Sequence, residues 1–432
     1  MPDVVSEIAS YLRRLFPICR SITGEGNRET LRILQELVPL KVLEYPSGQK
    51  VYDWTIPREW NIRDAWIKNA SGEKVVDFQR SNLHVVSYSI PVHARMKKRD
   101  LAEHLHFRED LPSAIPYRTT YYKEDWGFCL SHDDYRKHFN DDETYEVFID
   151  SELKQGGLSV GELTIKGRTD KEYLISTYIC HPSLANDNLT GPVLTAFLAR
   201  ELLREKTNFS YRVVFVPETI GAIAYCANNE EVMKRIGTGF VVSSVGGPGK
   251  VGYRQSWQKD SVINSVIEET FREKGITDYK VYPFDIHGSD ERQYSSQGFR
   301  INIASINKDR FYDYPYYHTS LDDLDFVSAE NVAFCLDLHV AALRNLDRNI
   351  VYRNLSPNCE VMLSKHGLYE TTGGGQLPVF GTRSRQDLIL WLLFYCDGTK
   401  SLWEISRLLD MPVGPLFDLA DELAKRNLLV ES

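Results

Sequence analysis

The chain has 432 residues, of which 42% are hydrophobic and 26% charged, the composition of a globular protein. Its net charge of −9 gives no support to nucleic acid or an anionic membrane as the main partner. Seven cysteines without a CxxC pair do not form a disulfide framework and suit a reducing cytoplasm. No apolar run approaches the roughly 20 residues of a membrane span, and no signal-peptide core is present. We therefore expect a cytoplasmic protein that crosses no membrane.

The first 150 residues divide into two parts with different patterns. Apolar residues at helical spacing predict helices over residues 3–17 and 28–37, joined by the sequence RSITGEG. From Val42 onward, short alternating runs separated by turn clusters predict a β-rich domain over residues 45–149. Because the two helices have no core of their own, we expect them to pack on the following domain, into which the β-rich domain is inserted.

Strands and helices alternate after residue 150, which is typical of an α/β fold with a mainly parallel sheet and helices on both faces. The predicted catalytic domain is therefore discontinuous and comprises residues 1–44 and 150–347. Its strands are predicted near 172–180, 211–217, 239–245 and 300–306, and its helices near 189–205, 220–236, 261–274 and 328–346.

Residues 348–432 have the size and order of elements of a winged-helix domain. A Gly373–Gly375 linker precedes three short helices. From Arg383 to Ser432, six basic residues face eight acidic ones, a net charge of −2. Because a DNA-recognition helix is basic, this favours a protein-contact or dimerisation role over DNA binding. The helices are predicted at 383–395, 400–409 and 413–426.

The sequence STYICHPSLANDNLTG, residues 176–191, joins the first predicted strand to the first predicted helix of the sheet. His181 ends the strand and Asp187 precedes the helix, so both lie at the carboxyl edge of the sheet, where α/β proteins form ligand sites. Imidazole and carboxylate groups are zinc ligands. Cys180 is not expected to join them, because neighbouring residues of a strand point to opposite faces.

Two further polar residues lie at ends of predicted elements. Glu218 follows an apolar strand and can accept a proton from an attacking water, or it is an acidic residue at a helix start, where the helix dipole favours it. His318 lies in a loop before the last helix of the sheet domain, and a lone loop histidine is more often a solvated or capping residue than a ligand. Two histidines and two carboxylates at one sheet edge favour the interpretation as a metal site.

The sequence DIHGSDERQY, residues 285–294, is a further candidate. Asp290 and Glu291 can hold a substrate ammonium group, and Arg292 can hold a carboxylate through its planar guanidinium. The alternative is a helix start capped by Ser289, with acidic residues in the first turn. That alternative explains most of the pattern.

The motifs HPSLANDNLTG, VFVPETIGA, GSDERQY and YYHTSLDDLD, in this order, resemble the bacterial zinc aminopeptidase-like family often encoded beside polysaccharide-biosynthesis genes. That family is a distant branch of the zinc exopeptidases, related to bacterial leucyl aminopeptidases. The resemblance extends to RSITGEG and to DWTIPREWNIRDAWI, SNLHVVSYS and WGFC in the inserted domain, and so covers nearly the whole chain. It implies a zinc-exopeptidase-like mixed, mainly parallel sheet, an inserted β-rich domain and a C-terminal winged helix.

The resemblance also implies roles for individual residues. His181 and His318 match metal-binding histidines, and Asp187 matches the aspartate that bridges two metals in relatives. Glu218 matches the general base, and Tyr317 resembles a tyrosine that steadies the tetrahedral oxyanion.

Three positions depart from the well-studied relatives. Thr219 stands where they have a second, metal-binding glutamate, residues 241–245 lack their aspartate ligand, and Ser183 replaces the aspartate of their HxD motif. Two zinc ions in this architecture need about five protein ligands, whereas three ligands and a water hold a single catalytic zinc. We therefore expect one zinc ion, held by the two matched histidines and the aspartate.

The sequence thus predicts a zinc-dependent hydrolase of the aminopeptidase type. It would cleave an amide next to a free amine on a small peptide or an amino-acid-modified metabolite. The first alternative is a catalytically degenerate peptidase scaffold that binds a ligand or partner without turnover, motivated by Thr219 and the missing aspartate. A transcription regulator acting through the winged helix is the second. The expected partners are a small peptide or aminoacyl substrate, with neither nucleic acid nor membrane, and a homo-oligomer can form through the inserted or winged-helix domain.

Overall fold

The computed structural model describes residues 2–310, 312–369 and 384–432. The chain forms two compact units, each described here by itself. The first comprises Met1–Lys259 and Thr277–Val340, and the second Asp260–Ile276 and Ala341–Ser432. Residues 260–276 thus belong to the second unit, although they were expected within the catalytic domain. The predicted Gly373–Gly375 linker lies outside the described residues.

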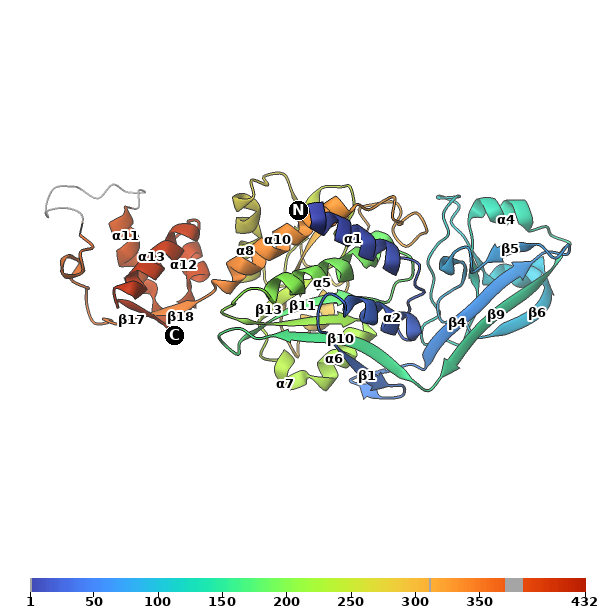
Figure 1. Ribbon diagram of the computed structural model, residues 1–432, viewed down its shortest axis with the longest axis horizontal. Coiled ribbons are helices and arrows are strands. Elements are labelled where there is room, and N and C mark those ends of the chain that lie inside the picture. Colours follow the sequence, from blue (N-terminus) through green and yellow to red (C-terminus); the bar gives the residue numbers. More distant parts are fainter. Residues whose placement is uncertain (1, 311, 370–383) are drawn as a thin grey trace. The chain divides into compact units, whose positions relative to one another are not determined.

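A mixed sheet is the framework of the first unit (Figure 1). Four of the seven strand pairs in its described residues are parallel, so the sheet is mainly parallel, as predicted. In sheet order, the strands are β1 (Lys41–Pro46), β10 (Gly157–Ile165), β12 (Ser210–Val216), β11 (Glu172–Tyr178), β13 (Thr238–Val241), β16 (Asn302–Lys308), β14 (Val251–Arg254) and β15 (Lys280–Tyr282).

Helices cover both faces of this sheet, as predicted. Figure 1 shows α1 (Pro2–Leu15) and α5 (Thr190–Leu202) on one face, and α6 (Ile220–Asn228) and α7 (Glu230–Met233) on the other. Every residue of β12 is buried, because a central strand covered by helices on both faces has no solvent side. The other helices of the sheet domain are α2 (Glu25–Leu34), α9 (Glu291–Tyr294) and α10 (Ala329–Asp347), the last of which contributes residues to both units.

The inserted domain is built on a second, antiparallel sheet. Strands β4 (Glu59–Lys68) and β9 (Thr144–Lys154) pair along most of their length, and β5 (Lys74–Asp77) and β6 (Val92–Lys97) flank them. Alternate residues of β9 face the core of this domain. The shorter elements are β2 (Lys50–Val51), β3 (Trp54–Thr55), α3 (Lys98–Leu101), β7 (Leu105–His106), β8 (Phe128–Cys129) and α4 (His132–His138).

Glu59, at the start of β4, ties the inserted domain to helix α2. Its side chain is only 5% exposed, and its carboxylate accepts hydrogen bonds from the two terminal nitrogens of Arg28, at 2.6 and 3.1 Å. The backbone N–H of Gly157 and the amide of Asn61 also donate to it. The hydrogen bonds from Arg28 lower the pKa of Glu59 to about 2. The ionised carboxylate therefore stabilises the fold fully above pH 4.5, and this contribution is lost as the pH falls toward 2.

We predict that Glu59→Gln lowers the free energy of unfolding by about 1–3 kcal/mol at pH 7, because a buried, charge-assisted network loses its anion. The difference from the wild type shrinks below pH 4.5, where the wild-type carboxylate begins to bind a proton. Urea unfolding at neutral and acidic pH measures both effects. Asp150→Asn, which removes a surface partner of Arg63, is the control and costs less than about 1 kcal/mol. Equal costs for the two variants at pH 7 would contradict the prediction.

The second unit contains the predicted winged helix. Helices α11 (Arg385–Tyr395), α12 (Leu402–Leu408) and α13 (Gly414–Lys425) accompany a three-stranded sheet in the described residues. Capping boxes begin the first two helices, with the side chains of Ser384 and Ser401 each accepting a backbone N–H. The unit also includes α8 (Val262–Glu273), and its strands are β17 (Val351–Asn354), β18 (Asp397–Ser401) and β19 (Leu429–Glu431).

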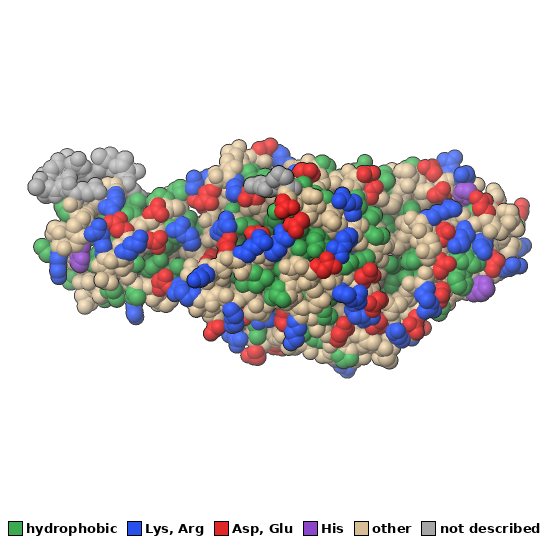
Figure 2. Space-filling model, viewed as in Figure 1, with side chains coloured by type: hydrophobic (Ala, Val, Ile, Leu, Met, Phe, Trp, Pro, Cys, Tyr) green, Lys and Arg blue, Asp and Glu red, His purple; other side chains and the backbone are tan. Residues whose placement is uncertain are grey.

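Charges of both signs mix on the molecular surface. Figure 2 shows basic and acidic side chains interspersed on the visible face of each unit, without a continuous basic field. In the winged helix, Glu422 of α13 pairs with Arg385 and, at 3.0 Å, with Arg426. Within the described part of the chain, no helix combines the length and the apolar character needed to cross a bilayer.

Candidate metal centre and active site

His181 lies just beyond the carboxyl end of β11 and is held there by the N-terminal segment. The Nε of buried Arg20 donates a 2.8 Å hydrogen bond to the carbonyl of His181, and its Nη1 donates to the carbonyl of Leu15 at 2.6 Å. Burial lowers the pKa of Arg20 to about 10, so the guanidinium is still charged at neutral pH. The RSITGEG sequence thus supports the loop that carries His181.

Asp187 lies in the irregular segment Ala185–Leu189 between β11 and α5, and its Asp187–Asn188 peptide bond is cis. The carboxylate of Asp322 accepts hydrogen bonds from the backbone N–H groups of Asn186 and Asp187, at 2.6 and 2.9 Å. The hydroxyl of Tyr178 donates to Oδ1 of Asp187. No role was predicted for Asp322, although the acidic run LDDLD after His318 was a signal. Asp187 is therefore fixed in two places: Asp322 holds its backbone N–H, and Tyr178 holds Oδ1 of its carboxylate.

His318 reaches the same edge from the loop between β16 and α10. Its ring centroid lies 5.4 Å from that of His181, with the two planes at 80°. Its Nε2 lies 3.0 Å from Oδ2 of Asp187. Both of these atoms are buried, and neither has a hydrogen-bond partner of acceptable geometry within the described residues. Nε2 of His318 and Oδ2 of Asp187 are therefore close together without forming a hydrogen bond of good geometry.

The ligand atoms of His181, Asp187 and His318 all lie within 4.8 Å of one another, so these side chains can hold a metal ion. Buried polar atoms without a partner are rare in proteins, so this pair of atoms fits a bound cation, and nitrogen and carboxylate ligands suit zinc. Although burial disfavours the charged imidazole, the Asp187 carboxylate raises the pKa of His181 well above its ordinary value. Burial opposes ionisation of Asp187 as well, yet the two histidines lower its pKa. The ionised carboxylate of Asp187 thus makes the electrostatic environment of the three side chains favourable for a cation.

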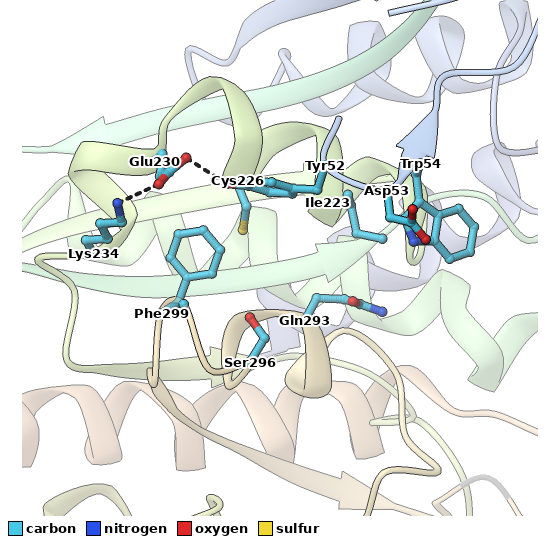
Figure 3. A pocket seen from close by; sticks show the side chains of 11 residues that line it. Tyr52, Asp53, Trp54, Ile223, Cys226, Glu230, Lys234, Gln293, Ser296 and Phe299 are labelled. Atoms are coloured by element: carbon cyan, nitrogen blue, oxygen red, sulfur yellow. Dashed lines mark hydrogen bonds and ion pairs between the residues drawn. The ribbon is translucent and has the colours of Figure 1, made fainter. Parts of the chain in front are cut away.

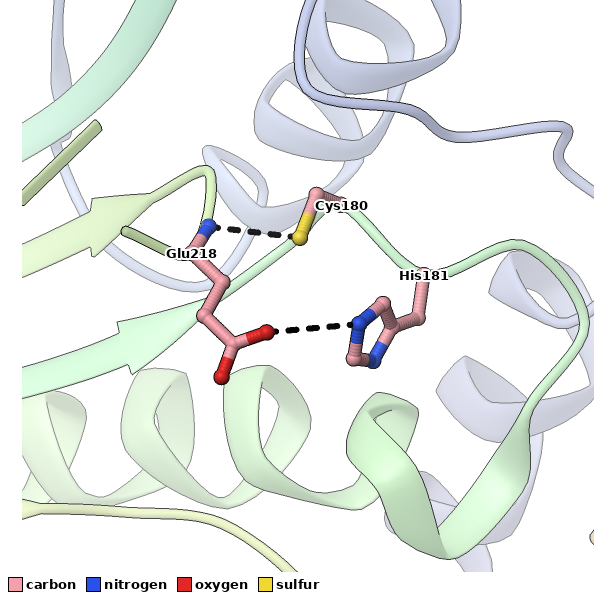
Figure 4. Close-up of side chains that lie close together, drawn as sticks. All are labelled: Cys180, His181 and Glu218. Carbon is pink, nitrogen blue, oxygen red and sulfur yellow. Dashed lines mark hydrogen bonds and ion pairs between the residues drawn. The ribbon is translucent and has the colours of Figure 1, made fainter. Parts of the chain in front are cut away.

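Glu218 follows the neighbouring strand β12 and faces His181 (Figure 4). Its Oε2 lies 3.5 Å from Nε2 of His181, and its backbone N–H donates to Sγ of Cys180 at 3.2 Å. The prediction that Cys180 points away is wrong, because Sγ lies within 4.8 Å of the ligand atoms of His181 and Glu218. Strand β11 ends at Tyr178, so strand alternation no longer applies at Cys180. Burial raises the pKa of the Cys180 thiol to about 12, and its Sγ accepts the hydrogen bond from the backbone of Glu218.

A cavity of about 220 Å³ opens beside these residues. Arg292 of α9 lines it and donates a 3.3 Å hydrogen bond to the carbonyl of Ile286, with no carboxylate partner among the described residues. The ring of Tyr317 stacks on that of His318 at 3.9 Å. Burial raises the pKa of Tyr317, so its hydroxyl keeps its proton. The lining comprises Tyr178, His181, Asp187, Glu218, His287, Gly288, Ser289, Arg292, Tyr312 and Tyr317.

Asp290 and Glu291 do not line this cavity. Oδ1 of Asp290 accepts a 2.7 Å hydrogen bond from the backbone N–H of Thr219, and burial raises the pKa of this carboxyl well above its ordinary value. Oε1 of Glu291 accepts a hydrogen bond from Ser305, and its Oε2 lies 3.7 Å from buried Arg254. Their role in holding a substrate ammonium group stays a prediction, and the cavity gives it no support.

The positions that depart from the well-studied relatives place no carboxylate near the metal ligands. The hydroxyl of Ser183 donates to the carbonyl of Phe16 at 2.8 Å. Thr219 has a φ of +64° and is held through its backbone. Ser243 and Ser244 are buried, and their hydroxyls have no hydrogen-bond partner within the described residues. These three positions therefore supply no acidic metal ligand.

Tyr117, which sequence reasoning missed, brings the inserted domain to the metal centre. The backbone N–H of Tyr117 donates to the carbonyl of His318 at 2.8 Å, and Pro116 forms a β-bridge with Thr319. The ring of Tyr117 meets both imidazoles edge-on, with centroids 5.3 Å from His181 and 5.2 Å from His318. No motif or spacing marks this tyrosine in the sequence. The inserted domain therefore packs directly against both candidate metal-binding histidines.

Two family models match the chain. One is described as a domain of unknown function (DUF4910) and matches residues 9–349, and a winged helix-turn-helix model matches residues 350–431. A Clostridium acetobutylicum protein, provisionally named a polysaccharide biosynthesis protein with an aminopeptidase-like domain, is 41% identical over 423 residues, 98% of this chain and 96% of the relative. The chain belongs to the DUF4910 family.

Solved structures show that this DUF4910 chain has an aminopeptidase-like fold. A crystal structure from C. acetobutylicum, provisionally named a peptidase, is 39% identical with a TM-score of 0.86, covering 100% of this chain and 97% of that one. BSAP, a zinc aminopeptidase from Bacillus subtilis, has a TM-score of 0.57 over 79% of this chain and 94% of its own. Since BSAP is only 14% identical, the likeness shows the fold alone. The predicted family resemblance, the fold class and the winged helix are confirmed.

Proposed function

We propose that this chain is a zinc-dependent hydrolase that cleaves an amide next to a free amine, on a small peptide or an amino-acid-modified metabolite. The observation that carries the proposal is the convergence of His181, Asp187 and His318 within 4.8 Å, with Glu218 beside them. The zinc aminopeptidase fold supports it. Since three protein ligands with an open position are typical of a single catalytic zinc, we propose one ion per chain.

The residues around the ligands supply the other parts of a hydrolytic site. A zinc ion bound there would polarise the scissile carbonyl and lower the pKa of a water ligand to about 7. Glu218 would accept the proton of the attacking water and pass it to the leaving amine. The hydrogen bond from its backbone to Cys180 holds this glutamate at the cavity wall. Tyr317, which keeps its proton, would donate a hydrogen bond to the developing oxyanion.

The cavity limits the size and charge of the substrate. Its volume of about 220 Å³ is below the range typical of drug-sized ligands, about 300–1,000 Å³, which favours one small acyl or amine group over a long peptide. Arg292 gives its lining a cationic group, so we propose that a substrate carboxylate pairs with Arg292. The name of the C. acetobutylicum relative favours an amino-acid-modified metabolite of polysaccharide synthesis.

Arg292→Lys is expected to raise KM about 10- to 100-fold for substrates with a carboxylate, because one ammonium cannot reproduce a bidentate, charge-assisted pair. The same substrates with the carboxylate amidated should show no such change. Steady-state kinetics on the matched pairs measures it. Arg300→Lys is the control, since Arg300 packs on Trp257 and does not line the cavity. An equal rise in KM for acid and amide substrates would show that Arg292 does not hold the carboxylate.

Metal removal tests the proposed activity. Dialysis against a chelator should abolish hydrolysis of aminoacyl amides and amino-acid-modified sugars, and one equivalent of zinc should restore it. Hydrolysis that survives complete removal of the metal would exclude a metal-dependent enzyme. Absence of hydrolysis on every amide tested, with zinc bound, would instead support the second candidate.

The departures from relatives favour that second candidate, a scaffold that binds its ligand without turnover. Thr219 and the stretch 241–245 occupy positions where well-studied relatives have acidic ligands, and neither provides a carboxylate. Such a scaffold would bind zinc and a small ligand, and Glu218→Gln would behave as the wild type does. Metal-dependent hydrolysis that disappears in His318→Ala with the fold intact would exclude it.

We also propose that the winged-helix domain contacts protein, since Glu422 pairs with two of its basic residues. Duplex DNA binding that weakens with salt would contradict this role.

A further inference from the structure

A second cavity of the first unit shares helix α9 with the candidate active site. Arg292 lines the first cavity and Gln293 lines the second (Figure 3). The second cavity measures about 340 Å³, within the range of ligand sites of about 300–1,000 Å³. It lies between the hairpin of β2 and β3, helices α6 and α7, and the residues that follow α9. The lining comprises Tyr52, Asp53, Trp54, Ile223, Cys226, Glu230, Lys234, Gln293, Ser296, Gly298 and Phe299.

Aromatic rings form much of its apolar surface. Tyr52 and Trp54 flank the tip of the hairpin and are 54% and 39% exposed, large values for such side chains. The ring of Phe299 lies 6.4 Å from that of Tyr52, with the planes inclined at 67°. Figure 3 shows Ile223 between the tyrosine and the tryptophan. The aromatic rings of the lining are therefore inclined to one another and do not form two parallel walls.

Three polar side chains border this surface without a partner. Asp53, Gln293 and Ser296 make no side-chain hydrogen bond or ion pair with the described residues, although all three line the cavity. Lys234 is paired with Glu230 at 2.5 Å, and the hydroxyl of Tyr52 donates to the same glutamate. The lining thus offers a carboxylate, an amide and a hydroxyl as hydrogen-bond partners, while its lysine is already paired.

We propose that this cavity binds a sugar ring. A pyranose has C–H groups on its faces and hydroxyls around its edge, so one face can pack on Trp54 or Tyr52 while the hydroxyls bond to the three free polar side chains. An aliphatic chain would make no hydrogen bond to those side chains. A phosphate would find Lys234 already paired. The inference rests on this cavity alone and does not require that the chain be a hydrolase.

Saturation-transfer NMR on the full chain tests the proposal with three probes, the methyl glycosides of glucose, galactose and N-acetylglucosamine. Protein saturation should reach the ring protons of at least one of them. Trp54→Ala should weaken its binding at least about 10-fold, through the loss of an aromatic contact surface, and Gln293→Leu should also weaken it. Trp391→Ala, which removes an equally exposed tryptophan (39%) from the winged-helix domain, should change nothing.

Three outcomes would overturn the proposal. They are no transfer to any of the glycosides, unchanged transfer in both Trp54→Ala and Gln293→Leu, or tighter binding of adenosine or benzyl alcohol than of every sugar. Trp54 is partly exposed, so its truncation leaves the core intact, and circular dichroism confirms the fold. Repeating the titration with Glu218→Gln separates the two proposals, because sugar binding should persist in a variant without hydrolytic activity.

Discussion

Glu218→Gln lowers kcat on the best amide substrate by about 100- to 10,000-fold, the usual contribution of a general base. The substitution keeps the shape of the side chain and removes its ability to accept a proton. The backbone of Glu218, held by Cys180, and the neighbouring strand are unaffected, so the fold and the binding of substrate should persist. Single-turnover kinetics with bound zinc measures the loss.

The zinc content of the same variant decides which role Glu218 has. We assign the metal to two histidines and Asp187, so Glu218→Gln should retain one zinc ion per chain. Since Glu218 also lies within 4.8 Å of His181 and Cys180, a ligand role would appear as loss of zinc. Glu201→Gln, at a surface ion pair on α5, is the control and should match the wild type in both measurements. Wild-type turnover in Glu218→Gln would contradict the assignment of the base.

His318→Ala weakens zinc binding at least about 100-fold, because even the loss of a group that only orients a ligand typically costs 10- to 100-fold. The remaining pair, His181 and Asp187, leaves the ion with two protein ligands. Hydrolysis should fall in parallel, and zinc added in excess should restore part of it. Competition with a chromogenic chelator measures the affinity.

The matched control for this variant is His287→Ala, which removes another histidine that lines the same cavity but lies outside the ligand set. It should keep the zinc affinity of the wild type. Thermal unfolding of the metal-free proteins should show that both variants fold. Equal zinc affinity of His318→Ala and the wild type would contradict the assignment of this ligand.

The sequence could place most of the site because its residues lie at the ends of recognisable elements. His181 and Glu218 follow buried apolar runs that are strands β11 and β12, and neighbouring parallel strands bring their carboxyl ends to one edge. Asp187 lies in the segment that joins the end of β11 to α5, so it was also predicted at this edge. His318 was ambiguous in isolation, since its loop has no periodicity. The presence of two histidines and two carboxylates at one predicted sheet edge, and then the family resemblance, connected it to the others.

The errors come from contacts between distant segments and from element boundaries. Cys180 was predicted to point away because the strand was extended by two residues beyond Tyr178, a typical uncertainty at a strand end. Tyr117 reaches the histidines through the packing of the inserted domain, which no local pattern encodes. The role of Asp290 and Glu291 in holding an ammonium group stays a prediction, because an ammonium site and a helix start share this composition.

The sequence predicted one part of the main sheet and missed another. Alternation of strands and helices predicted the mainly parallel centre of the sheet, whereas β1 and β10, which extend it antiparallel, were not predicted. Strand β10 is mostly buried on both faces, so it lacks the alternation that marks a half-buried strand.

The most direct test of the account is a crystal structure of the zinc-loaded chain with anomalous data at the zinc edge. We predict one zinc ion per chain, bound by His181, Asp187 and His318, with Glu218 beside it but not coordinated. Two ions in the site, an ion bound by Cys180, or no ion at full zinc saturation would contradict the account.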